Sequence, residues 1–411
     1  MRLVAICLCL LFVSCSAENF EDKIKEYQVG GNKISSKKEY DLVKMVEYTI
    51  QNPNLDHRFN RGSLDVLFQD SLLYFNFQNK IKILNLETET LSEVILDDFE
   101  LRSDLIYLHP ISKDSIVTLQ RLPPILMIND SKGKIFYKET LPYFPFDIDD
   151  IWWKSMQSFS GKNNFNFNIQ PLRNLFFDHK NQTIHIPILA VDYLFLKDVS
   201  DAETIGVFDL RAKNWKNGYG KSRGLMRYRG ENNYSGVFDR NYFLVRGDTS
   251  YLSYPISHHI FLINNKTDEL IAEILASPEV ADPISSPIKK EWLTSSDFVK
   301  MNDWRSTTPF YSQLMYHEDN ELFSRIYFHK MGLSNSFAGS YWENRDMTLL
   351  IFDKNLSLLD EIKLDPEVFE LWRYIPTGDG MLVSEMNKQK DLENSDQILL
   401  GYTARYKING K

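Results

Sequence analysis

Carboxylates and tryptophans occur close together at Asp147, Asp149, Trp152 and Trp153. In an extended chain Asp147 and Asp149 point to the same side, because successive side chains alternate. Two carboxylates on one side suit general acid–base chemistry or a Ca²⁺ site. The glycine of a calcium loop is missing here, and a solvated acidic loop is the simpler interpretation. Asp147 and Asp149 are therefore weak catalytic candidates.

Arginine and tryptophan together suit recognition of a carboxylate or a sugar. The candidates for binding a ligand or partner are Trp152, Trp153, Arg246, Trp292, Trp304, Arg305, Trp342, Arg345 and Arg373. Arg246, Arg325, Arg345 and Arg373 fall in predicted loops or near strand ends that adjoin them. The arginines are also ordinary salt-bridge partners in a chain with 56 acidic residues. The tryptophans can instead pack as a lid over the domain, so both interpretations stay open.

No catalytic or metal-binding motif is complete. Residues 220–224 match G-x-S-x-G by letter, but the strand and helix that a nucleophile elbow requires do not flank them. His258 and His259 are neighbours, which on a strand point to opposite faces and cannot easily chelate one ion. Glu321 stands where His317 would need a second histidine for H-E-x-x-H. We therefore expect no metal and no cofactor, and we favour a protein without catalytic activity.

Composition restricts the class of protein. The chain has 411 residues, of which 43% are apolar and 25% charged, and its net charge is −9. These values exclude a disordered or fibrous protein, and the negative net charge argues against nucleic acid as a binding partner. Aromatic and β-branched runs dominate over alanine-rich stretches, which favours β-sheet.

A repeated hairpin indicates the fold class. Five segments share an apolar residue, then Asn or Asp, and a second apolar residue seven positions after the first. They are Leu84-Asn85…Leu91, Ile128-Asn129…Ile135, Phe208-Asp209…Trp215, Ile263-Asn264…Leu270 and Phe352-Asp353…Leu359. Asx side chains bond to backbone groups two residues on and start hairpin turns. The identical spacing predicts a repeated unit.

A second strand pair precedes each hairpin, with short polar turns at 69–70, 112–114, 179–182, 239–241 and 317–320, and a sixth turn at 377–380. Four antiparallel strands in each of six units predict an all-β, six-bladed β-propeller. A seventh blade within 276–311 is the alternative. The sixth unit has only three strands, so we predict that residues 40–50 supply its outer strand and close the ring.

The loop lengths predict which face of the propeller functions. In a four-stranded blade, turns between the first and second and between the third and fourth strands share one face, and all other connections leave from the opposite face. The long segments are 142–171, 194–204, 249–257, 276–310, 332–346 and 387–396. Each belongs to the second kind of connection, and together they carry Trp152, Trp153, Trp292, Trp304 and Trp342. Long irregular loops in compact domains are usually functional or disordered.

The N-terminus predicts export. Arg2 precedes an apolar run from Leu3 to Val13 that is too short to span a bilayer. The sequence Phe12-Val13-Ser14-Cys15 resembles a bacterial lipobox, which implies cleavage before Cys15 and lipidation of its thiol. We therefore divide the chain into a lipoprotein signal peptide (1–14), a flexible tether (15–38) and the propeller domain (39–411). An ordinary signal peptide is the alternative.

These features together resemble an uncharacterised family of Bacteroidetes lipoproteins with a six-bladed propeller. The resemblance implies an outer-membrane lipoprotein on the periplasmic or cell-surface side, held to the membrane by its lipid, but no activity. We expect a non-catalytic protein that binds a protein or glycan through the face with the long loops. A glycan-active hydrolase or lyase using loop carboxylates is the alternative, and a structural subunit of an envelope complex is a third.

Overall fold

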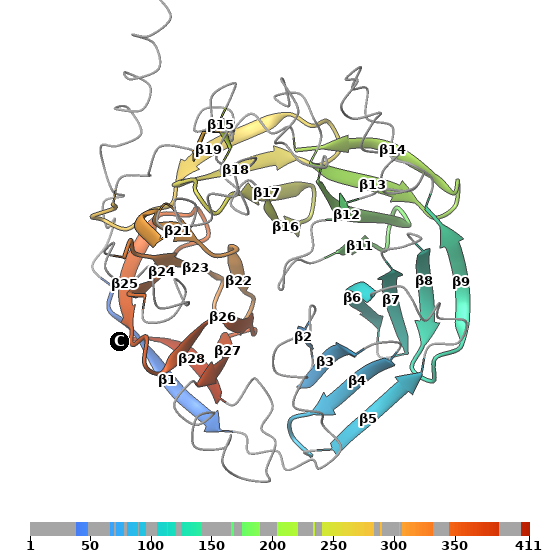
Figure 1. The fold of residues 1–411 in the computed structure, drawn as a ribbon, viewed down its shortest axis with the longest axis horizontal. Helices are drawn as coiled ribbons and strands as arrows, with labels where there is room; N and C mark the ends of the chain where they lie inside the picture. Colours follow the sequence, from blue (N-terminus) through green and yellow to red (C-terminus); the bar gives the residue numbers. More distant parts are fainter. Residues whose placement is uncertain are drawn as a thin grey trace, which may run out of the picture.

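A ring of antiparallel sheets forms the protein in its computed structural model (Figure 1). The structure describes residues 38–47, 66–69, 71–77, 80–88, 90–95, 105–112, 114–120, 125–141, 166–167, 175–189, 204–220, 233–234, 241–282, 288–289, 304, 306–331, 345–385 and 404–411. Strands are the main secondary structure of this described part. No helix within it has the length and apolar character that crossing a membrane would need.

Six blades surround the axis, and in each the strands run from the innermost, A, to the outermost, D (Figure 1). Blade I contains β2 (Val66–Gln69), β3 (Leu72–Phe77), β4 (Lys80–Asn85) and β5 (Thr90–Ile95). Blade II contains β6 (Leu105–Ser112), β7 (Ser115–Gln120), β8 (Ile125–Asp130) and β9 (Ile135–Thr140). Blade III contains β10 (Asn166–Phe167) and β11 (Phe176–Asp178), which both pair with β12 (Thr183–Leu189), then β13 (Ile205–Asp209) and β14 (Asn214–Tyr219).

The second half of the ring follows the same plan. Blade IV contains β16 (Tyr242–Arg246), β17 (Thr249–Ser253), β18 (His259–Asn264) and β19 (Leu270–Leu275). In blade V, β21 (Phe310–Tyr311) and β22 (Met315–His317) both pair with β23 (Leu322–Phe328), followed by β24 (Met347–Phe352) and β25 (Leu358–Leu364). Blade VI contains β26 (Phe369–Pro376), β27 (Gly380–Glu385), β28 (Ala404–Gly410) and β1 (Tyr40–Glu47). Outside the blades, β15 (Asn233–Tyr234) pairs with β20 (Ile288–Lys289).

The two ends of the chain close the ring, as the sequence predicts. β1 pairs antiparallel with β28 from Tyr40↔Gly410 to Glu47↔Ala404. The Lys411 amide also donates to the Glu39 carbonyl at 2.9 Å. The ring has six blades, and in the described part of 276–311 the only strands are β20 and β21, so the alternative of a seventh blade is wrong.

The Asx residues shape the predicted hairpins through their side-chain oxygens. Oδ1 of Asn85 accepts from the amides of Glu87 and Thr88 at 2.9 and 3.1 Å. The same two-amide pattern occurs at Asp209, Asn264 and Asp353. In blade II the acceptor is Asp130 rather than the predicted Asn129, whose Nδ2 instead donates to buried Thr118 at 3.1 Å.

The inner strands of blade IV correct one prediction. The A–B turn is Gly247-Asp248, with Gly247 at φ +58°, a backbone conformation that favours glycine. The predicted turn at 239–241 is therefore wrong, because it precedes strand A. Residues 249–257 are likewise not a long loop, since they hold β17 and part of a short connection. Apolar residues lie on both sides of Gly247, so the strand pattern fits a turn at 239–241 as well as one at Gly247-Asp248.

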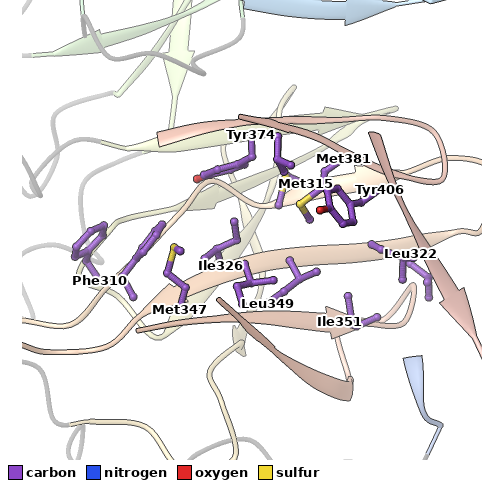
Figure 2. Close-up of a cluster of buried hydrophobic side chains, with 14 of the residues drawn as sticks. Phe310, Met315, Leu322, Ile326, Met347, Leu349, Ile351, Tyr374, Met381 and Tyr406 are labelled. Atoms are coloured by element: carbon purple, nitrogen blue, oxygen red, sulfur yellow. The ribbon is translucent and has the colours of Figure 1, made fainter. Parts of the chain in front are cut away.

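The core lies between neighbouring blades. Where blades V and VI meet, Phe310, Ile326 and Leu349 pack in one cluster with Tyr374 and Met381 (Figure 2). Every residue of β24 is buried, which explains its unbroken run of apolar residues and threonine. Burying each such aliphatic side chain contributes roughly 1.5–3 kcal/mol. The blades therefore form a rigid ring from which the connections emerge.

Candidate functional site: the long-loop face

Strand order places the long connections on one face. We call this face, from which the B–C and D–A connections leave, the long-loop face, and the opposite one the short-turn face. Antiparallel strands alternate in direction, so both ends of every B–C and D–A connection lie on the long-loop face. The structure removes 249–257 from the predicted set of long connections and adds 220–241, between β14 and β16.

Most of the candidate residues lie outside the described residues. These are Cys15, Asp147, Asp149, Trp152, Trp153, Trp292, Arg305 and Trp342. Arg373 belongs to β26, but its side chain is also outside the description. The structure therefore places the side chains of three candidates, namely Trp304, Arg345 and Arg246.

Trp304 lies in the core. Its side chain is 9% exposed and packs in the same cluster as Ile256 and Phe310. Its carbonyl accepts the hydroxyl of Thr308 at 2.7 Å and that of Thr307 at 3.2 Å. For this tryptophan the structure supports packing, and its exposed area leaves little surface for a ligand.

Arg345 fixes one end of the long connection between blades IV and V. The residue is 1% exposed and lies two positions before β24, which begins at Met347. Its Nη2 donates to the Ser306 carbonyl at 2.7 Å, and its Nη1 donates to the Thr308 carbonyl at 3.1 Å. Its guanidinium carbon lies 4.8 Å from the ring centre of Phe310. Burial lowers the Arg345 pKa to about 10, so the group stays charged at neutral pH.

Arg325 fixes the other end of the same connection. Its guanidinium donates to the carbonyls of Tyr254 at 2.9 Å, Ser312 at 3.2 Å and Ala276 at 3.4 Å. Arg325 lies in the middle of β23 and is fully buried, not near a strand end as the sequence suggested. The Ser312 carbonyl that it binds lies in the break between β21 and β22. A single charge in the apolar stretch LFSRIYF is the sequence signal for this role.

A partly exposed polar group borders the same connection, and we call Asp282, His329 and Lys330 the Asp282 cluster. Asp282 lies 3.2 Å from Lys330 Nζ and 3.7 Å from His329 Nδ1. The Tyr327 hydroxyl donates to Asp282 Oδ2 at 3.3 Å and accepts the Asp282 amide at 2.9 Å. His329 Nε2 lies 2.8 Å from Thr348 Oγ1. These side chains offer a carboxylate, an imidazole and an ammonium side by side.

Burial sets the protonation of this cluster. Burial lowers the His329 pKa, and the nearby Asp282 carboxylate only partly offsets that effect. Burial also raises the pKa of the Tyr327 hydroxyl. At neutral pH His329 is therefore a neutral donor and acceptor, and Tyr327 keeps its proton. The cluster can form directed hydrogen bonds to a ligand from a fixed frame.

Arg246 lies on the other face. It ends β16 at the A–B turn, which belongs to the short-turn face, so its predicted position on the long-loop face is wrong. The error follows from the misplaced turn of blade IV. Its guanidinium carbon lies 3.5 Å from the ring centre of Tyr316 and 5.7 Å from that of Phe323.

One buried pair resembles a nucleophile with its base. His317 Nε2 lies 2.7 Å from Ser324 Oγ, and His317 Nδ1 lies 3.0 Å from the Thr377 carbonyl. Both side chains are fully buried, so no substrate can reach the serine. Nor does the described part of the chain hold a group of three or more His, Cys, Asp or Glu residues suited to a metal ion.

Comparison with known proteins gives structural likeness without sequence relatives. No family model and no curated protein matches the chain. A member of the DUF4221 family from Bacteroides vulgatus matches with a TM-score of 0.61 and 13% identity, over 92% of this chain and all (100%) of the other. A Bacteroides fragilis protein described as exported gives 0.49 and 10%, over 93% and 98% of the two chains. The WD40 domain of Neurospora crassa Pan2 gives 0.40 and 9%, over 87% and 84%. At these identities the likeness concerns the fold alone.

Proposed function

We propose that the protein is a lipid-anchored propeller of the outer membrane that binds a protein or glycan through its long-loop face, without catalysis. The observation that carries the proposal is the strand order, by which every long connection begins and ends on that face. Sequence variation and insertions accumulate in such loops when a rigid scaffold presents them for binding.

The described part of the long-loop face is built to hold its shape. Arg325 and Arg345 fix both ends of the connection between blades IV and V through five hydrogen bonds to backbone carbonyls. The Asp282 cluster lies beside these fixed ends. Preorganised polar groups bind a ligand with little loss of conformational entropy, which supports recognition at this sector.

Site-specific photocrosslinking in intact cells tests the binding face. We expect p-benzoylphenylalanine at His329 or Lys330 to yield discrete crosslinked products. The matched control is the same residue at Lys354, which is exposed on the β24–β25 turn of the same blade but on the short-turn face. Equal products from both faces would contradict the proposal, as would no products together with an empty glycan array. Glycan turnover that Asp147→Ala or Asp149→Ala abolishes would instead establish the hydrolase or lyase.

Lipidation is tested separately. Metabolic labelling with a fatty-acid analogue should mark the wild-type chain, and Cys15→Ala should remove both the label and sedimentation with outer membranes. A multiply acylated cysteine holds a soluble domain on a bilayer because each buried CH₂ contributes about 0.8 kcal/mol. Unlabelled but secreted wild-type protein would support the ordinary signal peptide instead.

A further inference from the structure

The short-turn face carries a cation, Arg246, that has no ion-pair partner among the described residues. Arg246 is exposed, and its contacts in the described part of the chain are the rings of Tyr316 and Phe323. Arg246 ends the innermost strand of blade IV, and Tyr316 belongs to the innermost strand of blade V (Figure 1). The group therefore lies near the axis of the ring.

An aromatic platform fixes the orientation of this guanidinium. Tyr316 and Phe323 pack at 4.9 Å between ring centres, and Tyr251 packs on Phe323 at 5.1 Å. Stacking on Tyr316 covers the flat face of the guanidinium and leaves its N–H groups, which lie in the plane, directed outward. Such a stacked arginine is prepared for a planar, bidentate anion at a lower entropic cost than a mobile side chain.

Of the four acidic residues in the adjoining turns, Asp248 and Asp319 are engaged elsewhere. Asp248, in the same turn, lies 2.7 Å from Lys266 Nζ. Asp319, in the adjoining turn of blade V, packs its carboxylate against Gly378 of blade VI. A Cβ added to Gly378 would lie only 2.5 Å from an oxygen of that carboxylate. A Cβ on Gly247 would meet nothing within 4 Å, so the space beside the turn is open. Exposed Glu318 and Glu321 in the blade V turn disfavour a dianion more than a monoanion.

We propose that Arg246, stacked on Tyr316, forms a binding site for a monocarboxylate group at the centre of the short-turn face. Two N–H groups of the guanidinium meet the two carboxylate oxygens, and the Tyr316 ring holds the guanidinium in place. The ligand class is a small molecule bearing one carboxylate, supplied by a uronic acid or by an amino-acid derivative. This site is independent of the long-loop face and of the function proposed for it.

Saturation-transfer NMR on the full-length chain tests the site with four probes: D-glucuronate, N-acetylglycine, D-glucose and inorganic phosphate. We expect saturable binding of both carboxylates, none of glucose, and weaker binding of phosphate. Arg246→Gln should raise the Kd for both carboxylates by ~10-fold or more, and Arg246→Lys should weaken them less, because a lysine keeps the charge but loses the bidentate geometry. Tyr316→Leu should also weaken binding, whereas Lys354→Gln, which removes an exposed charge on the same face, should not.

Three results would overturn the proposal. Carboxylate binding that survives Arg246→Gln would place the site elsewhere. Binding of glucuronate and glucose without N-acetylglycine would indicate sugar recognition. Arg246-dependent binding of phosphate as tight as that of the carboxylates would indicate a general anion site. Circular dichroism of each variant shows whether it is folded. None of these results bears on the crosslinking experiment, which tests the long-loop face separately.

Discussion

At the scale of single residues, Arg325 shows how a buried charge can be structural. Replacing it with Met leaves the carbonyls of Tyr254, Ala276 and Ser312 without their shared donor. Each buried acceptor that loses its partner costs about 1–3 kcal/mol. We expect Arg325→Met to lower the free energy of unfolding by about 3 kcal/mol or more, measured by denaturant titration. Arg246→Gln is the control, and loss of its exposed stacking on Tyr316 predicts a change of at most about 1 kcal/mol. Equal stability of both variants would contradict the role assigned to Arg325.

The same residues show where sequence reasoning stops. Arg246 and Arg345 were equal candidates for recognition, yet the structure exposes the first and buries the second. Trp304 was proposed for a binding loop and lies in the core. Residue type gives the chemistry of a side chain, but its accessibility depends on segments distant in sequence. The carbonyls that bind Arg325 come from three such segments, and nothing local to position 325 reveals them.

At the scale of elements, the Asx hairpins give a direct test of the turn chemistry. Asp209 Oδ1 accepts the amides of Arg211 and Ala212, and Oδ2 lies 2.7 Å from Lys216 Nζ. The hydrogen bond with Lys216, followed by those of the turn amides, lowers the Asp209 pKa. We expect Asp209→Ala to cost about 1–2 kcal/mol of unfolding free energy and Asp209→Asn to cost less, because Asn keeps the turn acceptor.

Acid dependence provides the check for Asp209. A carboxyl whose pKa is lower in the folded chain stabilises it above the unfolded pKa of about 4, and that contribution disappears as the pH falls. The wild type should therefore lose its advantage over Asp209→Ala at low pH. A difference between the two chains that persists unchanged in acid would show that the carboxylate charge is not involved.

The outer hairpins were predictable and the inner strands were less so, for a physical reason. An outer hairpin has a local turn signal, since Asn85, Asp209, Asn264 and Asp353 each bind amides two to four residues on. Inner strands are shaped by contacts between blades. Ser312, in the break between β21 and β22, binds Arg325 of β23, and β16 was misplaced because Gly247 gave a weaker signal than the polar residues before it. The sequence still predicted the long-loop face, because the alternation of strands in the other five blades does not depend on where the turn of blade IV lies.

At the scale of the whole molecule, the β1–β28 pair should control stability of the ring. The bond from the Lys411 amide to the Glu39 carbonyl shows that residues 39 and 411 form a hydrogen-bonded pair. Backbone amides point alternately toward and away from the partner strand, so the Val43 amide faces β28 and the Lys44 amide faces away. Val43→Pro removes a ladder bond although the Val43 side chain is exposed. We expect it to lower the unfolding free energy by roughly 1–2 kcal/mol and to increase proteolysis of blade VI. Lys44→Pro, whose amide faces outward, should have a smaller effect. Equal effects would contradict this register.

Buried histidines at successive blade junctions make the ring sensitive to acid. His185 Nδ1 lies 2.9 Å from the Tyr219 hydroxyl, which accepts Ser250 of blade IV, and His258 Nδ1 lies 2.5 Å from Tyr311 of blade V. Burial lowers the pKa of His185 to about 4 and that of His258 to about 3. The positive charge of Arg325 and the neighbouring His259 lower the His258 pKa further, and Asp282 raises it in part. The unfolded chain takes up these protons near pH 6.5, while the folded chain does not.

Stability should therefore fall as the pH drops from about 6.5 toward about 4, by on the order of 1 kcal/mol per pH unit for each such histidine. Denaturant unfolding at a series of pH values measures this slope. His258→Gln can keep a hydrogen bond to Tyr311 but cannot be protonated, so it should flatten the slope even if its stability at pH 7 is lower. Carboxyls whose pKa is lowered, such as Asp209, act in the same direction only at lower pH, so the difference between wild type and His258→Gln from about pH 5 to 6.5 reports on His258. A slope in that window that is unchanged in His258→Gln would mean that the junction between blades IV and V opens, and accepts its proton, before the ring unfolds.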